Sequence, residues 1–148
     1  MWALLLAPAL AASESMHRYE EDMRGWWNRA DQTFSHIKYD RWLWSPDRLV
    51  RDWNATWLHR LPAAPGHVVE YGIGAGLLGE TLLTQRGASY YTGLDVSDRQ
   101  LSHAEKRLTA CCVSRFSLAR VDALDATHLR NAQTFVSQAV IQHFPSVE

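Results

Sequence analysis

Cysteine is scarce in this sequence, which has only two among its 148 residues. Cys111 and Cys112 are adjacent, and this spacing suits neither a disulfide framework nor a zinc site. We therefore expect reduced cysteines, no metal site, and a cytoplasmic protein.

An excess of positive charge is also lacking, because 15 Lys and Arg residues stand against 16 Asp and Glu residues. Proteins that bind nucleic acids usually present a basic surface to the phosphates, and this composition gives no sign of one. The 47% of hydrophobic residues and the chain length are typical of one globular core. The oligomeric state is not indicated.

Long hydrophobic runs are missing too, since a transmembrane helix needs roughly 20 apolar residues. The most apolar stretch lies in residues 1–16, where the chain from Met1 to Ala12 is apolar and closes with small residues. This pattern is typical of a signal peptide's core and cleavage site, but the positively charged beginning is absent. A secretory signal, an apolar helix packed on the protein, and an extension ahead of a start at Met16 all remain open.

Tryptophan, in contrast, is abundant in residues 17–66, which we interpret as a helical cap and a linker. Its clearest helix begins at Ser45-Pro46-Asp47, with a capping hydroxyl, a proline in the first turn and an acid. Four apolar residues then recur at helical spacing and predict one buried face: Val50, Trp53, Trp57 and Leu61. The other tryptophans of this segment are Trp26, Trp27, Trp42 and Trp44. A core role in the cap and a lid over a bound ligand are both open for them.

Residues 67–148 alternate between strand and helix patterns. Strands are predicted at 68–71, 90–94, 116–121 and 134–137, with helices at 77–86, from a capping box at Ser97-Asp98-Arg99-Gln100, and from 139 onward. Such alternation is typical of a parallel sheet with right-handed crossovers. We therefore expect an α/β fold with a Rossmann-like parallel sheet of about four strands, flanked by helices.

The most informative stretch is Glu70-Tyr71-Gly72-Ile73-Gly74-Ala75-Gly76, between the first strand and its helix. Glycines at alternate positions permit positive φ and let the backbone approach a ligand. The first amides of the following helix then favour a carboxylate or a phosphate. This pattern predicts a small anionic cofactor.

The glycines alone leave two cofactors open, because 74–79 also matches the dinucleotide fingerprint, with Asp95 near the distance of a ribose-binding acid. Glu70 favours the other candidate. A carboxylate in a buried strand needs a cationic or donor partner, which the ammonium group of a methionine moiety supplies, whereas a pyrophosphate would repel the acid.

On these residues, the chain from Val68 to about Glu148 resembles the class I S-adenosylmethionine-dependent methyltransferases. The resemblance implies S-adenosylmethionine as the cofactor, with the acid Asp95 accepting hydrogen bonds from both ribose hydroxyls. It also implies that Val121-Asp122-Ala123 meets the adenine, and that the fourth strand and its turn border the methyl group. The cofactor-binding residues implied are Glu70, Gly72, Ile73, Gly74, Gly76, Asp95, Val96, Asp122, Ala123 and Gln138.

The sequence departs from this family in two ways. Gln133 stands near the place where relatives commonly have an acid before the fourth strand. The family's sheet normally has seven strands, whereas the fourth predicted strand here is the last. We therefore expect a methyltransferase domain cut off before its substrate site is complete, which would bind cofactor poorly and could be inactive.

The resemblance implies methyl transfer to an acceptor that we expect to be a small molecule. His143 is the candidate general base within the matched region, because imidazole titrates near neutral pH, although an ordinary helix position explains it too. Two other classes stay open: an NAD-dependent oxidoreductase, and a non-catalytic remnant or partner-binding module.

Overall fold

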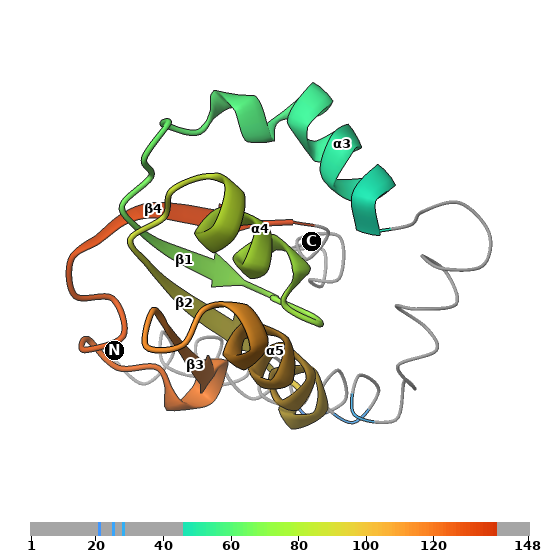
Figure 1. The fold of residues 1–148 in the computed structure, drawn as a ribbon. Coiled ribbons are helices and arrows are strands. Elements are labelled where there is room, and N and C mark those ends of the chain that lie inside the picture. Colours follow the sequence, from blue (N-terminus) through green and yellow to red (C-terminus); the bar gives the residue numbers. More distant parts are fainter. Residues whose placement is uncertain (1–20, 22–24, 26–27, 29–45, 139–148) are drawn as a thin grey trace, which may run out of the picture.

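The computed structural model describes Glu21, Gly25, Asn28 and residues 46–138. Three helices and four strands dominate that part of the chain (Figure 1). In order, the elements are α3 Pro46–Thr56, η2 Leu58–Arg60, β1 His67–Tyr71, α4 Leu77–Gln85, β2 Tyr90–Asp95, α5 Asp98–Cys111, β3 Phe116–Arg120, η3 Val121–Ala123 and β4 Ala132–Ser137. The predicted helix from residue 139 and the segment 1–16 lie outside the described residues.

The four strands form one parallel sheet in the order β3-β2-β1-β4, as the alternating pattern predicted. β1 lies in the centre and pairs with β2 on one edge and β4 on the other. β2 and β3 are thus added on one side of β1 in sequence order, and β4 is then added on its other side. This reversal of direction beside β1 creates a switch point, where open α/β sheets bind their ligands.

One face of the sheet packs against the helices. α4 and α5 lie over this face, and α3 packs beside α4 (Figure 1). The apolar side chains that the strands direct toward these helices include Val68, Tyr91 and Val136, all buried. The main core therefore lies between the sheet and the three helices. A smaller cluster of Val69, Leu94 and Ala119 lies on the opposite face.

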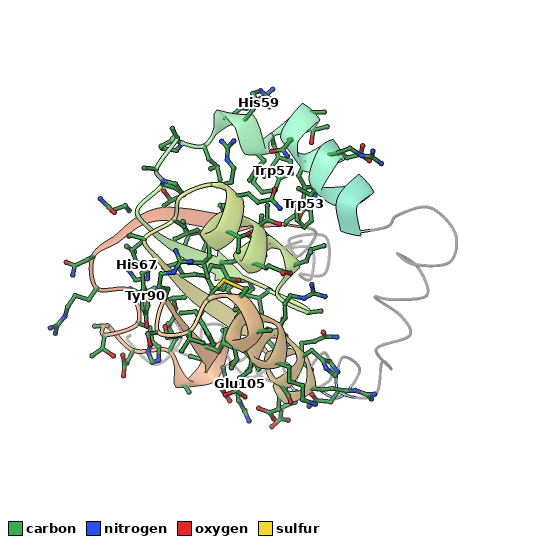
Figure 2. All side chains as sticks on the ribbon, in the orientation of Figure 1. Trp53, Trp57, His59, His67, Tyr90 and Glu105 are labelled. Atoms are coloured by element: carbon green, nitrogen blue, oxygen red, sulfur yellow. A yellow bond between two sulfur atoms is a disulfide. The ribbon has the colours of Figure 1, made fainter. Side chains whose placement is uncertain are left out.

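The face predicted for the first described helix is confirmed. Trp53 is buried, and Val50, Trp57 and Leu61 pack against the same core. Figure 2 shows Trp53 of α3, and Trp57 just after this helix, on the side that faces α4, with their ring centroids 6.2 Å apart. The helix ends at Thr56, however, and the next turn is the 3-10 helix η2. The remaining cap tryptophans lie outside the described residues.

The start of β1 is fastened to β4 by side chains. Gln133 Oε1 accepts from the His67 amide at 3.1 Å, and Thr134 Oγ1 donates to the Pro65 carbonyl at 2.9 Å. A Cβ at Gly66 would stand 1.6 Å from the same Gln133 oxygen. A larger residue at position 66 would therefore displace the Gln133 side chain from its bond to the His67 amide.

The expectation of reduced cysteines is wrong. Cys111 and Cys112 form a disulfide at the end of α5. The backbone angles of Cys112, φ −141° and ψ 34°, are not helical. Its side chain therefore does not point where the next side chain of an α-helix would. The helix terminus thus allows two neighbouring sulfurs to meet, which spacing alone did not predict.

The capping box is half formed. Ser97 caps α5, and its side chain accepts from the Gln100 amide. The return bond from the Gln100 side chain does not form, because the Ser97 amide donates to Asp95 Oδ1 at 2.9 Å. Gln100 Oε1 is buried without a hydrogen-bond partner. Asp95, at the end of β2, thus accepts the hydrogen bond from the Ser97 amide that Gln100 would accept in a complete capping box.

Candidate cofactor site

The carboxyl ends of all four strands meet at one edge of the sheet. Tyr71 pairs with Leu94 on β2 and with Ser137 on β4, and Asp95 pairs with Arg120 on β3. The described predicted site residues follow or end these strands: Glu70 to Gly76 at β1, Asp95 and Val96 at β2, Asp122 and Ala123 at β3, and Gln138 at β4. The sheet therefore brings the predicted positions to one edge. His143 lies outside the described residues.

The glycine loop has the backbone that its sequence predicts. Gly72, Gly74 and Gly76 all have positive φ, at 78°, 51° and 77°. The Gly72 amide donates to the Leu94 carbonyl at 2.7 Å, which ties the beginning of the loop to β2. Residues other than glycine rarely adopt such positive φ angles. The three alternating glycines therefore specify this turn.

Ile73 has the one large apolar side chain of the loop from Gly72 to Gly76, and this side chain points into the core. Its exposed fraction is 5%. Gly93 on β2 makes space for it, because a Cβ there would stand 2.9 Å from Ile73 Cδ1. Any ligand contact of Ile73 would therefore come from its main chain, while its side chain anchors the loop.

Glu70 is buried on the face that α4 covers, with 3% of its surface exposed. Its Oε2 accepts from the Tyr91 hydroxyl at 2.6 Å. Burial raises the pKa of Glu70 to about 8, against the lowering effect of this hydrogen bond, and the nearby Asp95 raises it further. The predicted donor partner exists, but it is a tyrosine of the neighbouring strand.

The Tyr91 ring fits under α4 because residue 79 is a glycine. A Cβ at Gly79 would stand 2.5 Å from Tyr91 Cζ. Glycine within a helix costs about 1 kcal/mol relative to alanine, so its presence here needs a packing reason, which the ring supplies. Gly79 therefore permits the Tyr91–Glu70 hydrogen bond.

Asp95 faces the glycine loop. Its Oδ2 accepts from the Gly74 amide at 3.0 Å, and its Oδ1 accepts from the Ser97 amide. Only 7% of the residue is exposed, and burial raises its pKa to about 6 although these amides oppose the rise. Asp95 is thus joined to the loop, and each oxygen retains acceptor capacity for a further donor.

The β3 end of the site is more exposed than the β1 and β2 ends. Asp122 pairs with Arg120, whose Nε donates to Oδ1 at 2.9 Å and whose Nη2 bonds Oδ2. Arg120 also reaches Asp98 Oδ2 at 3.5 Å. Asp122 therefore has a cationic partner that the sequence pattern did not suggest. Ala123 is exposed, and Gln138, which follows β4, is half-buried.

A hollow lies at the opposite end of the sheet, where the strands begin. Its volume is about 860 Å³, and its lining includes His67, Tyr90, Thr92 and Ser117. His67 bonds Thr92 Oγ1 through Nε2 at 2.9 Å and the Arg130 carbonyl through Nδ1 at 3.0 Å. Figure 2 shows His67 and Tyr90 side by side there. None of the predicted site residues lines this hollow.

Metal coordination finds no support in the part of the chain that the structure describes. No group of three or more His, Cys, Asp or Glu residues is placed there to hold an ion. Among the same residues, no helix has both the length and the apolar character to cross a bilayer.

The sequence matches no protein-family model and no curated protein. Solved structures do match. Magnesium protoporphyrin IX methyltransferase (ChlM) from Synechocystis PCC 6803, with bound SAM, superposes with a TM-score of 0.61 at 18% identity, over 86% of this chain and 64% of that one. Its form with bound SAH gives 0.60 at 17%, over 86% and 61%.

The chain thus has the Rossmann-like fold of the class I S-adenosylmethionine-dependent methyltransferases, as its glycine loop and strand order indicated. It spans 64% and 61% of the length of the two matching methyltransferase chains. At such low identity the similarity establishes the fold, and the function has to be argued from the site.

Proposed function

We propose that the glycine loop of this chain binds S-adenosylmethionine and that the protein transfers the methyl group to a small molecule. The observation that carries the proposal is a pair of buried carboxylates, Glu70 and Asp95, beside a loop of three positive-φ glycines. A cationic ligand relieves the cost of two buried acids, whereas a pyrophosphate adds two further negative charges.

Each site residue has a chemical part in this proposal. Asp95 offers two acceptor oxygens to a ribose diol. Glu70, once it gives up the proton that burial holds on it, offers a carboxylate to the ammonium of the methionine moiety. The main chain of the loop meets the ligand's carboxylate, as amides at a helix start favour anions. Val96, Asp122, Ala123 and Gln138 border the adenine and the methyl-transfer region in the same scheme.

When bound, S-adenosylmethionine supplies a methyl group on a cationic sulfur. The acceptor would be an N, O, S or C atom of the small molecule. The protein's contribution is to orient the acceptor and exclude water. His143 is the proposed base where the acceptor must lose a proton.

A small-molecule acceptor fits the balanced charge of the chain, whose composition lacks the excess of Lys and Arg that nucleic-acid-binding proteins usually carry. The matching ChlM structures are of an enzyme named for a porphyrin substrate, which is a small molecule too. A cytoplasmic location stays a prediction, and the Cys111–Cys112 disulfide removes one of its supports.

Ligand-induced thermal shifts test the proposal against its rivals. A ligand that binds only the native state raises the melting temperature. We expect S-adenosylhomocysteine to raise it and NAD to leave it unchanged. A shift with NAD alone would favour the oxidoreductase, and no shift with either would favour a non-catalytic module. The same assay on a longer form of the protein, if the gene encodes one, separates weak binding by an incomplete domain from no binding.

A further inference from the structure

Helix α5 contacts the glycine loop through two side chains one turn apart. A Cβ at Gly76 would stand 2.9 Å from Ala104 Cβ, so the helix approaches the loop as closely as a glycine permits. Three residues on, Arg107 Nε donates to the Ala75 carbonyl at 2.9 Å, and Arg107 Nη1 donates to Glu80 Oε2 at 2.7 Å. Residues at i and i+3 share a helix face, so both contacts come from one side of α5.

The Arg107 bond fixes the orientation of one peptide group in the loop. The Ala75 carbonyl and the Gly76 amide belong to the same planar unit and point in opposite directions. Holding the carbonyl toward α5 directs the amide the other way, where it donates to the Ile73 carbonyl at 3.0 Å. Glycines flank Ala75 on both sides, and their free rotation would otherwise let this unit turn.

Glu80, on the neighbouring helix α4, holds the Arg107 guanidinium in place. It lies in the first turn of α4, so Arg107 bridges α5, the loop and α4 at once. The Arg107 side chain is 27% exposed and that of Glu80 is 33% exposed, which limits the contribution of the ion pair itself to stability. Its geometric role is therefore larger than its energetic one.

We propose that Arg107 is a positioning residue that holds the glycine loop in the conformation that binds the cofactor. The proposal deepens the function proposed above and rests on it. A lysine cannot replace the arginine fully, because one ammonium on a flexible stem lacks the planar fork that reaches the carbonyl and the carboxylate together. Arg107 touches no reacting atom in this scheme.

The test compares three variants of the full chain with a matched control. Arg107→Ala removes both bonds, Arg107→Lys preserves the charge, and Glu80→Ala removes only the carboxylate partner. Lys106→Ala is the control, because it deletes a positive charge from the neighbouring exposed position of α5. Two readouts are measured: hydrogen exchange of the amides of residues 72–76 in the ligand-free protein, and the affinity for S-adenosylhomocysteine by calorimetry.

We expect Arg107→Ala to speed exchange in the loop and to weaken S-adenosylhomocysteine binding about tenfold, the loss typical of a charge-assisted hydrogen bond. Arg107→Lys should recover part of both effects, and Glu80→Ala should change affinity by about threefold at most. Lys106→Ala should match the wild type. If Arg107→Ala does not fold, Arg107→Lys is judged by the same two readouts.

The proposal is overturned if loop exchange and affinity in the Arg107 variants equal those of Lys106→Ala. A general loss of stability would speed exchange across the sheet and would count against a role confined to the loop. If the wild type itself does not bind S-adenosylhomocysteine, the proposed function fails, and the exchange data alone decide whether Arg107 orders the loop.

Discussion

The two ends of the same four strands differ in how their polar side chains are satisfied. At the amino end, His67, Thr92 and Ser117 bond one another across three strands, with Thr92 Oγ1 within 2.9 Å of the imidazole and 3.0 Å of the Ser117 hydroxyl. At the carboxyl end, the acids Glu70 and Asp95 are buried beside a glycine loop, and burial raises the pKa of both.

The polar groups at the amino end form a self-contained network, whereas those at the carboxyl end form the site that we propose for the cofactor. Hydroxyl and imidazole groups that bond each other stabilise the sheet without a third party. Buried carboxylates held by one hydroxyl and a few amides destabilise the protein in their charged form, and such unfavourable arrangements concentrate at functional sites. The hollow at the amino end is therefore a weaker candidate for the cofactor than the loop.

The largest effect is expected from Asp95→Ala. Losing two hydrogen bonds between a carboxylate and a ribose should weaken S-adenosylhomocysteine binding by about 4 kcal/mol, or about 1000-fold. Calorimetry measures the affinity. Asp98→Ala is the control, because this acid lies three residues away with 60% of its side chain exposed, and its removal should change affinity by less than about threefold. Retained affinity in Asp95→Ala would count heavily against the site.

The next effect concerns the pH dependence of stability. Glu70 has a pKa of about 8 in the folded protein and about 4.5 when unfolded, so between these values the folded state holds a proton that the unfolded state has lost. The free energy of unfolding should therefore fall as pH rises through this window, by about 1.4 kcal/mol per unit, and level off above pH 8. Asp95 acts in the same direction only up to about pH 6.

Denaturant unfolding of the wild type and Glu70→Gln between pH 6.5 and 8 isolates the Glu70 contribution, which should reach about 2 kcal/mol over that range. Glutamine does not ionise, so the variant should show a much flatter profile. Equal slopes in the two proteins would show that Glu70 is ionised in the folded state, and would remove the contrast between the two ends of the sheet.

Gly79→Ala tests the packing that supports the Glu70 hydrogen bond. Alanine normally stabilises a helix interior, but here its Cβ would collide with the Tyr91 ring, and we expect a net loss of about 1.5 kcal/mol. Thermal unfolding measures the loss. The double variant Gly79→Ala with Tyr91→Leu should recover part of it, since the smaller side chain removes the collision; an additive loss would mean that the ring is not the cause.

The smallest effect is expected at the amino end. Thr92→Val removes the hydroxyl that joins His67 and Ser117 and should cost about 1 kcal/mol of stability while leaving S-adenosylhomocysteine affinity unchanged. Thr84→Val, which loses only an exposed bond to the Glu80 carbonyl, is the matched control and should cost less. A fall in affinity for Thr92→Val alone would mean that the two ends of the sheet are coupled.

The sequence predicted those parts of the fold that depend on local patterns. Alternating strand and helix signals located β1 to β4, and the glycine spacing located the turn after β1, because period and φ preference are properties of neighbouring residues. The position of Asp95 at the end of a strand and ahead of a helix cap was predicted for the same reason.

Contacts between distant residues were missed. Tyr91 as the partner of Glu70, and Arg107 as the partner of Ala75, join positions 21 and 32 residues apart. Gly79 and Gly93 carried a usable signal, since a glycine inside a helix or strand often marks a close approach. Which side chain would fill the space followed only from the assembled sheet.

β1 receives its two neighbours at very different moments of synthesis. Its β2 partner ends at residue 95, whereas the β4 partner, with the Gln133 bond at the entrance to β1, is complete only at residue 137. The central strand of the nascent domain therefore keeps one row of amides and carbonyls unpaired while roughly forty further residues are made, which is several seconds at ribosomal speed. During that interval the central strand of the described sheet is an open edge, where another chain could pair with it.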